Sequence, residues 1–179
     1  EFDELLFRHA GSAYSNAAHA FLYALTGSLP ARVGTGGPLK KYYRQATRLS
    51  AAFAVVADVA MLTMQATLKR REMLSARLGD LLSMLYLLSM VLKQHHENGS
   101  PEDDLPLVEW CCRMLLHDYQ EALHEILLNL PNRPAAWKLR LLIFPLGRHF
   151  NPPPDKLESR IAALVTRDTE TRRRLIAGI

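Results

Sequence analysis

Residues 50–92 read SAAFAVVADVAMLTMQATLKRREMLSARLGDLLSMLYLLSMVL, and this stretch decides the fold. Apolar residues recur every three or four positions in both halves, which is the spacing of one face of an α-helix. Each half also carries a second apolar set on the opposite side of the helix. A helix that is apolar on two sides is expected to have protein on both sides. The stretch therefore predicts the two central helices of a helical bundle.

The composition predicts one ordinary globular domain. The chain has 179 residues, of which 49% are hydrophobic and 22% charged, and this balance excludes a disordered chain. The net charge of +4 is spread along the sequence without a groove-reading motif, so no nucleic-acid partner is expected. Cys111 and Cys112 are adjacent and poorly placed to bridge each other, which fits a reducing compartment.

No targeting or membrane-spanning segment is expected. Asp58 interrupts the best candidate for the roughly 20 apolar residues that a transmembrane helix needs. No signal peptide opens the chain. The sequence begins Glu1-Phe2-Asp3, already in helical periodicity, so we expect it to be a piece of a longer protein.

Glycine and proline divide the rest of the chain into helices. Breaks are expected at Gly27, at residues 98–101 and at residues 130–134. The turn between the two central helices is placed between Gln65 and Arg71, since sixty continuous helical residues would span roughly 90 Å. The sequence predicts an all-α single domain over 1–179. It should be an antiparallel helical bundle of about four long helices plus two or three short C-terminal helices, the last two near 155–165 and 169–177.

The motifs of catalysis and cofactor binding are missing. The glycine-rich loop at 28–37 lacks the spacing of a phosphate-binding loop. Glu121-x-x-His124, with His117 one turn earlier, matches half of a di-iron site, but no second such element exists, and this face is expected to point into solvent. We therefore assign no catalytic, cofactor-binding or metal-ligating residue.

Five polar residues are expected to be buried for structural reasons. His9 and Asn16 lie two turns apart beside an alanine stripe, and an interhelical hydrogen bond is favoured over a ligand contact. Asp58 stands alone among non-ionisable residues, so it needs a partner. Arg77 and Asp80 are three residues apart on the next helix. The hypothesis is that Arg77 bridges Asp58 and Asp80 across the central hairpin, the alternative being that Asp58 meets a backbone amide or an upstream domain.

The segment around Trp137 mixes aromatic, aliphatic and basic residues. Such a mixture is typical of a helix on a membrane surface. The basic residues point in different directions around the helix, however, which favours a buried or subunit-facing segment. The candidate membrane or subunit contacts are Trp137, Lys138, Arg140, Phe144 and Arg148.

Five blocks in order resemble the C-terminal domain of bacterial long-chain acyl-CoA dehydrogenases of the FadE type. They are LFRHAGSAYSNAAHAF (residues 6–21), RLSAAFAVVADVAM (48–61), LKRREMLSARLGDLLSMLYLLSMVLK (68–93), DLPLVEW (104–110) and NLPNRPAAW with IFPLGRHF (within 129–150). The resemblance covers nearly the whole chain, including the PPPDKL corner at 152–157.

The resemblance implies that the parent enzyme uses FAD to remove two hydrogens from the α,β carbons of a fatty acyl-CoA, the first step of β-oxidation. In that family the flavin takes a hydride and a glutamate takes the α-proton. That glutamate and the flavin-binding segments precede the matched region, so the resemblance assigns no catalytic residue here, and no FAD is expected in this chain alone.

For this chain the resemblance implies an accessory helical domain, itself non-catalytic. Its expected partner is the upstream dehydrogenase core of a homodimeric parent, in the cytoplasm and peripherally associated with the inner face of the cell membrane. Two alternatives remain. The domain completes the acyl or FAD pocket of the enzyme, or it is a stand-alone helical interaction domain.

Overall fold

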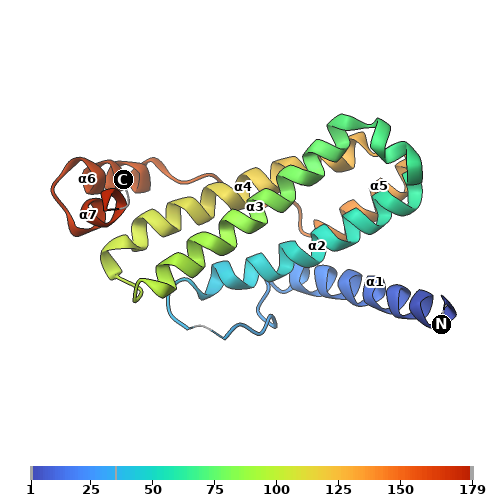
Figure 1. Cartoon of the computed structure of the whole chain (residues 1–179), viewed down its shortest axis with the longest axis horizontal. Helices are drawn as coiled ribbons and strands as arrows, with labels where there is room; N and C mark the ends of the chain where they lie inside the picture. The colour runs from blue at the N-terminus through green and yellow to red at the C-terminus, as the bar shows by residue number, and fades with distance from the viewer. Residues whose placement is uncertain (1, 35, 178–179) are drawn as a thin grey trace.

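The structure is a computed structural model that describes residues 2–34 and 36–177, without the side chains of residues 2, 3, 5–7, 9, 10, 66 and 69 (Figure 1). Within this part the chain forms seven α-helices and two 3₁₀ turns and no strand, which confirms the all-α fold. The elements are α1 (Phe2–Leu25), α2 (Lys40–Met64), η1 (Gln65–Arg70), α3 (Glu72–Glu97), η2 (Glu102–Asp104), α4 (Leu105–Asn129), α5 (Arg133–Ile143), α6 (Asp155–Thr166) and α7 (Glu170–Ile176).

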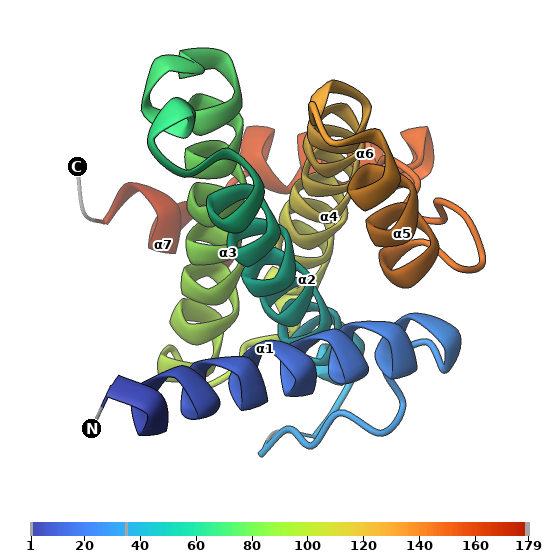
Figure 2. The same cartoon turned by 90° about the vertical axis from the view of Figure 1, so that its right-hand side faces the viewer.

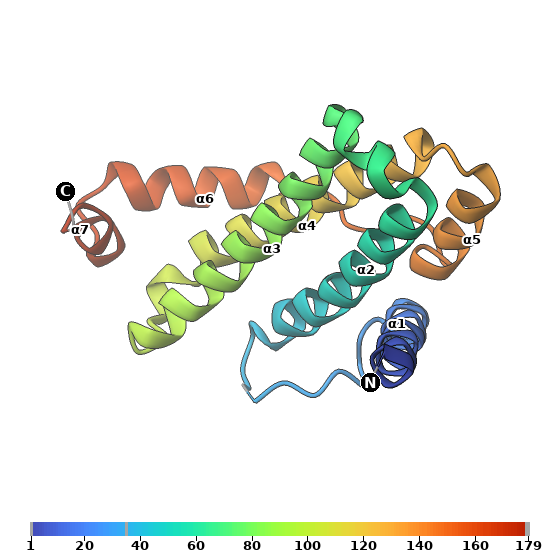
Figure 3. The same cartoon turned by 45° about the vertical axis from the view of Figure 1, so that its right-hand side comes forward.

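Three long helices, α2, α3 and α4, follow one another as antiparallel neighbours (Figures 1 and 3). Their contacts form the core, which is built from aliphatic residues at helical spacing. Fully buried members are Leu49, Val56 and Ala60 of α2, Leu81, Leu88 and Leu92 of α3, and Cys112, Tyr119, Leu123 and Ile126 of α4. The two apolar runs of residues 50–92 thus supply much of this core.

The remaining helices cover different parts of this layer. α1 crosses α2 and also contacts α5, as Figure 2 shows. α5 packs against α4 and α2. At the far end of the molecule α6 lies on α4, and α7 lies beside η2 (Figure 3).

Local sequence explains where most helices end. Gly27 follows α1 with φ +60°, a left-handed conformation that suits glycine. The chain turns at η1 within the predicted interval, and there the Thr67 hydroxyl donates to the Met64 carbonyl. Asn132 caps α5 by accepting a hydrogen bond from the Ala135 amide at 3.1 Å.

Within this chain α3 has protein on one side only, so the second apolar side that the sequence predicts for this helix is left uncovered. Its buried residues lie three, four or seven positions apart and make one narrow stripe: Leu74, Leu81, Leu88, Leu92 and His95. The opposite side of α3 faces solvent. The helix that is covered along its length is α4, which contacts α3, α5 and α6 and was expected to have a wet outer face. Helical periodicity identifies apolar faces but does not say which of them a given chain covers.

Candidate functional site

Arg48 of α2 carries a buried charge and is only 2% exposed. Its Nη2 donates to the carbonyl of Ile143 at 3.2 Å, and its Nη1 lies 3.0 Å from Nε2 of His149. The guanidinium also sits 5.6 Å from the centre of the Phe150 ring, within the range of a cation–π contact. Among the described residues no carboxylate pairs with Arg48, so its partners are all neutral. Burial lowers the pKa of Arg48 to about 10, which leaves it charged at neutral pH.

The segment that Arg48 holds, residues 144–151, is also fixed to α4. Oε1 of Gln120 accepts from the backbone amides of His149 and Phe150 at 2.9 and 3.0 Å. Nε2 of Gln120 donates to the Phe150 carbonyl at 3.2 Å, and Nδ1 of His117 lies 3.0 Å from the same oxygen. Gln120 is buried, so its amide replaces the backbone partners that this irregular segment lacks.

The contact with Arg48 also determines the state of His149. A guanidinium can only donate, so Nε2 of His149 must accept and carry no proton. Partial burial lowers the pKa of His149, and the charge of Arg48 lowers it further. The cluster of Arg48, Gln120, His149 and Phe150 contains no free nucleophile. It joins α2, α4 and the segment 144–151, so its role is structural.

The predicted bridge from Arg77 to Asp58 and Asp80 is wrong. Nε of Arg77 instead donates to Oε2 of Glu125 on α4 at 3.0 Å. Arg77 lies on the side of α3 that packs against α4, whereas Asp80 is exposed and Asp58 is only half-buried. Neither aspartate has an ion-pair partner among the described residues.

The polar pair on α1 is described only in part. The side chain of His9 lies outside the described residues. Asn16 is half-buried and, within the part of the chain that the structure describes, makes no interhelical hydrogen bond. The expected contact between α1 and a neighbouring helix through these residues stays a prediction.

The candidate membrane or subunit contacts separate into two groups. Trp137, Lys138 and Arg140 are exposed on α5, Trp137 by 67%. Phe144 is buried in the core, and Nη1 of Arg148 donates to Oε2 of Glu121 at 2.6 Å. Phe144 therefore does not reach a membrane or a partner, and Arg148 fastens the segment 144–151 to α4.

The metal-like spacing on α4 is occupied by other contacts. His117 approaches the Phe150 carbonyl and Glu121 pairs with Arg148. In the described part of the chain no group of three or more His, Cys, Asp or Glu side chains lies close enough to hold a metal ion.

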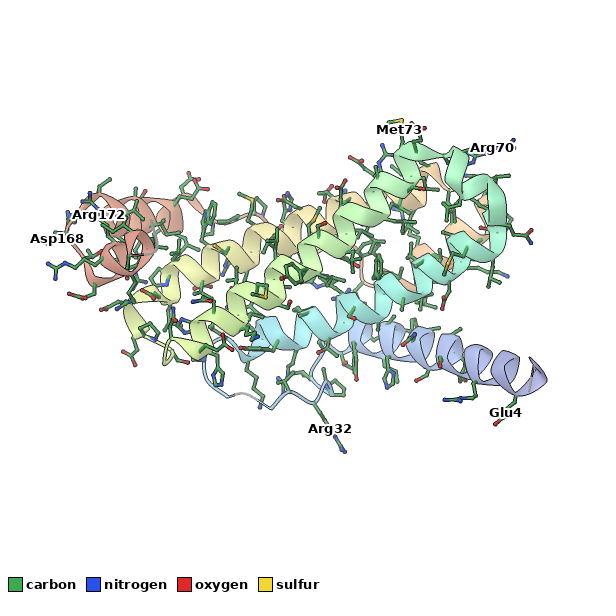
Figure 4. The ribbon with its side chains drawn as sticks, in the orientation of Figure 1. Glu4, Arg32, Arg70, Met73, Asp168 and Arg172 are labelled. Carbon is green, nitrogen blue, oxygen red and sulfur yellow. The ribbon has the colours of Figure 1, made fainter. Side chains whose placement is uncertain are left out.

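The outer side of α3 is an apolar surface without charge. Leu82, Tyr86 and Leu87 are 55%, 62% and 50% exposed, and we call these three residues the α3 face. The sequence has no charged residue from 81 to 92. Met73 extends the apolar surface toward the turn, where it projects outward beside Arg70 (Figure 4). Exposed helix faces normally carry charged side chains, so this face has the composition of an interface.

The length and composition of α2 and α3 bear on whether these helices could span a membrane. α2 and α3 are both long and apolar enough to cross a membrane by these two criteria, which tolerate a charged residue such as Asp58, so the expectation drawn from Asp58 stays a prediction. Core helices of soluble proteins pass the same test, so the criterion is weak evidence.

The comparison with known families bears on the whole chain. A family model described as "Acyl-CoA dehydrogenase, C-terminal, bacterial type" matches residues 1–179. The chain belongs to this family. No solved structure matches the chain. The resemblance stated from the five sequence blocks is confirmed, and the chain is a C-terminal domain of the acyl-CoA dehydrogenases, which are oxidoreductases.

Sequence reasoning missed the cluster around Arg48. The basic residue at position 48 sits at the edge of an apolar run, and nothing local distinguishes it from a solvent-facing arginine. Its partner His149 is 101 residues away. A signal existed only in Gln120, a polar residue among the core positions of α4.

Proposed function

We propose that the chain is a non-catalytic accessory domain of an FAD-dependent acyl-CoA dehydrogenase of fatty-acid β-oxidation, and that it packs on the dehydrogenase core through the α3 face. The observation that supports this role is the exposure of Leu82, Tyr86 and Leu87 on a helix side without charges. Full burial of each such side chain stabilises an interface by roughly 1.5–3 kcal/mol. Because the three side chains are 50–62% exposed, covering them contributes somewhat more than half of this, about 2–5 kcal/mol in all, which favours docking.

The same role predicts that the chain alone binds no flavin. The cluster around Arg48 is filled by protein groups, and the residues that hold FAD in the resembling enzymes precede the matched region. An absorbance spectrum of the purified chain tests this directly. Flavin bands that persist through gel filtration, or acyl-CoA-dependent dye reduction, would contradict a non-catalytic role.

A second surface supports peripheral association with the inner face of the cell membrane. Trp137 and Leu141 are 67% and 54% exposed on α5, beside the exposed Lys138 and Arg140. Aromatic and aliphatic side chains next to basic ones are typical of helices at a lipid–water interface. In this proposal the α3 face meets the core and α5 faces lipid, in a cytoplasmic and homodimeric parent enzyme.

The test is made in the full-length dehydrogenase with two paired substitutions. Leu82→Asp with Tyr86→Asp places charge on the α3 face, and Trp137→Ser with Leu141→Ser removes the apolar part of α5. Leu146→Asp is the matched control, since Leu146 is 69% exposed outside both surfaces.

We expect the α3 variant to loosen the domain from the core, seen as faster proteolysis between them. We expect the α5 variant to lose only vesicle binding. If the α3 variant behaves like Leu146→Asp, the α3 face is not the docking surface. If instead it loses FAD with the core still folded, the domain completes the flavin pocket.

A further inference from the structure

The turn that joins α3 to α4 contains the sequence Asn98-Gly99-Ser100-Pro101, at the end of the molecule that also carries α6 and α7 (Figure 1). Asn98, Gly99 and Ser100 are exposed. An asparagine followed by a glycine is prone to deamidation, because glycine has no side chain to hinder attack by its backbone nitrogen. Asn98 is the only asparagine of the chain that is followed by a glycine.

The side chain of Asn98 is held by a single hydrogen bond. Its Oδ1 accepts from Nε2 of Gln94, one turn earlier on α3, at 3.2 Å. Nδ2, the nitrogen that leaves in deamidation, donates to no residue in the described part of the chain. The attacking side is also open, because no heavy atom outside the neighbouring residues lies within 4 Å of the place where a Cβ on Gly99 would stand. Neither the leaving group nor the nucleophile is shielded by other side chains.

The backbone of the turn controls when the attack can occur. The Gly99 amide donates to the His96 carbonyl at 3.1 Å, and Asn98 has ψ 9°, which turns the Gly99 nitrogen away from the Asn98 side chain. Ring closure therefore requires the turn to open first. Ser100 has φ +56°, a left-handed conformation that strains a residue with a Cβ, so opening relieves strain. Exposed turns at helix ends also open at a low free-energy cost.

The other asparagines lack this combination of features. Asn129 precedes a leucine, and its Nδ2 donates to the Glu125 carbonyl at 2.8 Å. Asn132 precedes an arginine, and its Oδ1 caps α5. Asn16 precedes an alanine within α1. Asn151 precedes a proline, whose nitrogen has no hydrogen to lose. The turn after α3 is therefore the place where deamidation should occur first.

We propose that Asn98 is a site of spontaneous deamidation. The Gly99 nitrogen loses its proton to a base and forms a bond to Cγ of Asn98. The bond from Cγ to Nδ2 breaks, and Nδ2 takes up a proton and leaves as ammonia, so that a five-membered succinimide remains. Water then opens this ring at one of its two carbonyl carbons. Attack at Cγ gives aspartate, whereas attack at the backbone carbonyl gives isoaspartate, and water is the only reactant consumed.

Both products loosen the end of α3. Isoaspartate lengthens the main chain by one methylene between α3 and η2, which displaces the Ser100 amide from the carbonyl of the buried His95, where it donates at 2.9 Å. Either product also places a negative charge at the C-terminal end of α3, where the helix dipole is already negative. Glu97 and Glu102 are close in sequence and add to the repulsion. This modification does not depend on how the α3 face packs.

The test follows the full-length dehydrogenase during incubation at pH 6 and at pH 8, with tryptic digests at fixed times. The peptide 94–113 contains Asn98 as its only asparagine, and the peptide that begins at Met114 contains Asn129 and Asn132. We expect the mass gain of deamidation in the first peptide while the second stays unchanged. The gain should be faster at pH 8, because the attacking nitrogen must lose its proton. An isoaspartyl methyltransferase with S-adenosylmethionine should then methylate the aged, undigested enzyme.

Three variants separate the site from its consequence. Asn98→Gln should abolish the methylation, since glutamine closes a larger ring far more slowly, whereas the matched control Asn129→Gln should leave it unchanged. Asn98→Asp should accelerate amide exchange in residues 94–98 roughly two- to fivefold relative to Asn98→Gln, which is the effect of one charge at a helix end.

The proposal is overturned if the peptide 94–113 of the unmodified enzyme stays as intact as the peptide that begins at Met114. It is also overturned if deamidation yields no methylated product, since the succinimide must open in both directions. Equal amide exchange in Asn98→Asp and Asn98→Gln would show that the charge does not loosen the end of α3.

Discussion

Arg48 and His149 are 101 residues apart in sequence, yet Nη1 of the arginine lies 3.0 Å from Nε2 of the histidine. Together with the bond to the Ile143 carbonyl, this contact ties α2 to the chain beyond α5. The arginine is buried without a carboxylate among the described residues. Its charge is therefore stabilised by neutral acceptors and an aromatic ring, and the conformation of residues 144–151 depends on it.

Replacing Arg48 with methionine should destabilise the chain by about 1–3 kcal/mol, because the buried Ile143 carbonyl loses its donor. The loss should appear in urea unfolding, together with faster amide exchange in residues 144–151. Arg44→Met is the matched control one turn earlier on α2, where the buried Nε has no partner. That variant should be neutral. Equal losses in both variants would show that the bonds of Arg48 contribute nothing specific.

Stability should fall as the pH drops from 7 toward 5. The pKa values of His95, His124 and His149 are all lowered, first by burial. In the unfolded chain histidine binds a proton near pH 6.5, so below that pH the unfolded state binds more protons than the folded one. The free energy of unfolding then decreases with decreasing pH until the folded-state pKa values are passed.

His149→Gln should flatten this dependence while keeping an acceptor for Arg48. Melting temperatures between pH 5 and 7.5 measure the pH dependence of stability. The control is His96→Gln, which removes an exposed imidazole. A melting temperature that rises on acidification would contradict the sign of the effect.

Local signals in the sequence predict the helices well. Gly27 ends α1 because a left-handed residue is needed there. Gly99 and Pro101 separate α3 from α4, and Pro131 and Pro134 separate α4 from α5. These features act within a few residues of themselves, so a sequence contains them fully. Within the break at 98–101, Ser100 has φ +56°, and α4 begins only at Leu105 after the turn η2.

The contacts between helices are not encoded locally. Arg48 meets His149 and Asp104 meets Arg174 across 101 and 70 residues. Their geometry depends on how each helix is rotated about its axis. The same rotation explains the error at Arg77, which turns toward α4 and leaves Asp80 in solvent. The site lies where long-range packing brings polar residues together, so periodicity could not find it.

The ion pair of Arg77 and Glu125 should be worth less than about 1 kcal/mol, since Glu125 is 58% exposed. A double-mutant cycle with Arg77→Met and Glu125→Gln measures the coupling free energy. Asp80→Asn, three residues along α3, should leave stability unchanged. A coupling of about 3 kcal/mol would mean that the pair behaves as a buried one.

Asp104→Asn should release α7 from the body of the domain. Burial raises the pKa of Asp104, but the hydrogen bonds from Arg174 and Thr171 outweigh it and hold the pKa below its usual range. The stabilisation is therefore present above about pH 4 and is lost as the pH falls through the folded-state pKa.

Hydrogen bonds to a charged group contribute about 1.5–3 kcal/mol, so amide exchange in residues 170–176 should accelerate roughly 10- to 100-fold in the variant. Global unfolding should change little, because α7 is a short terminal helix that packs on α6 and η2. Asp103→Asn is the matched control, since Asp103 is exposed and adjacent. If both variants exchange alike, the carboxylate of Asp104 does not hold α7, and this helix is held by its packing on α6 and η2.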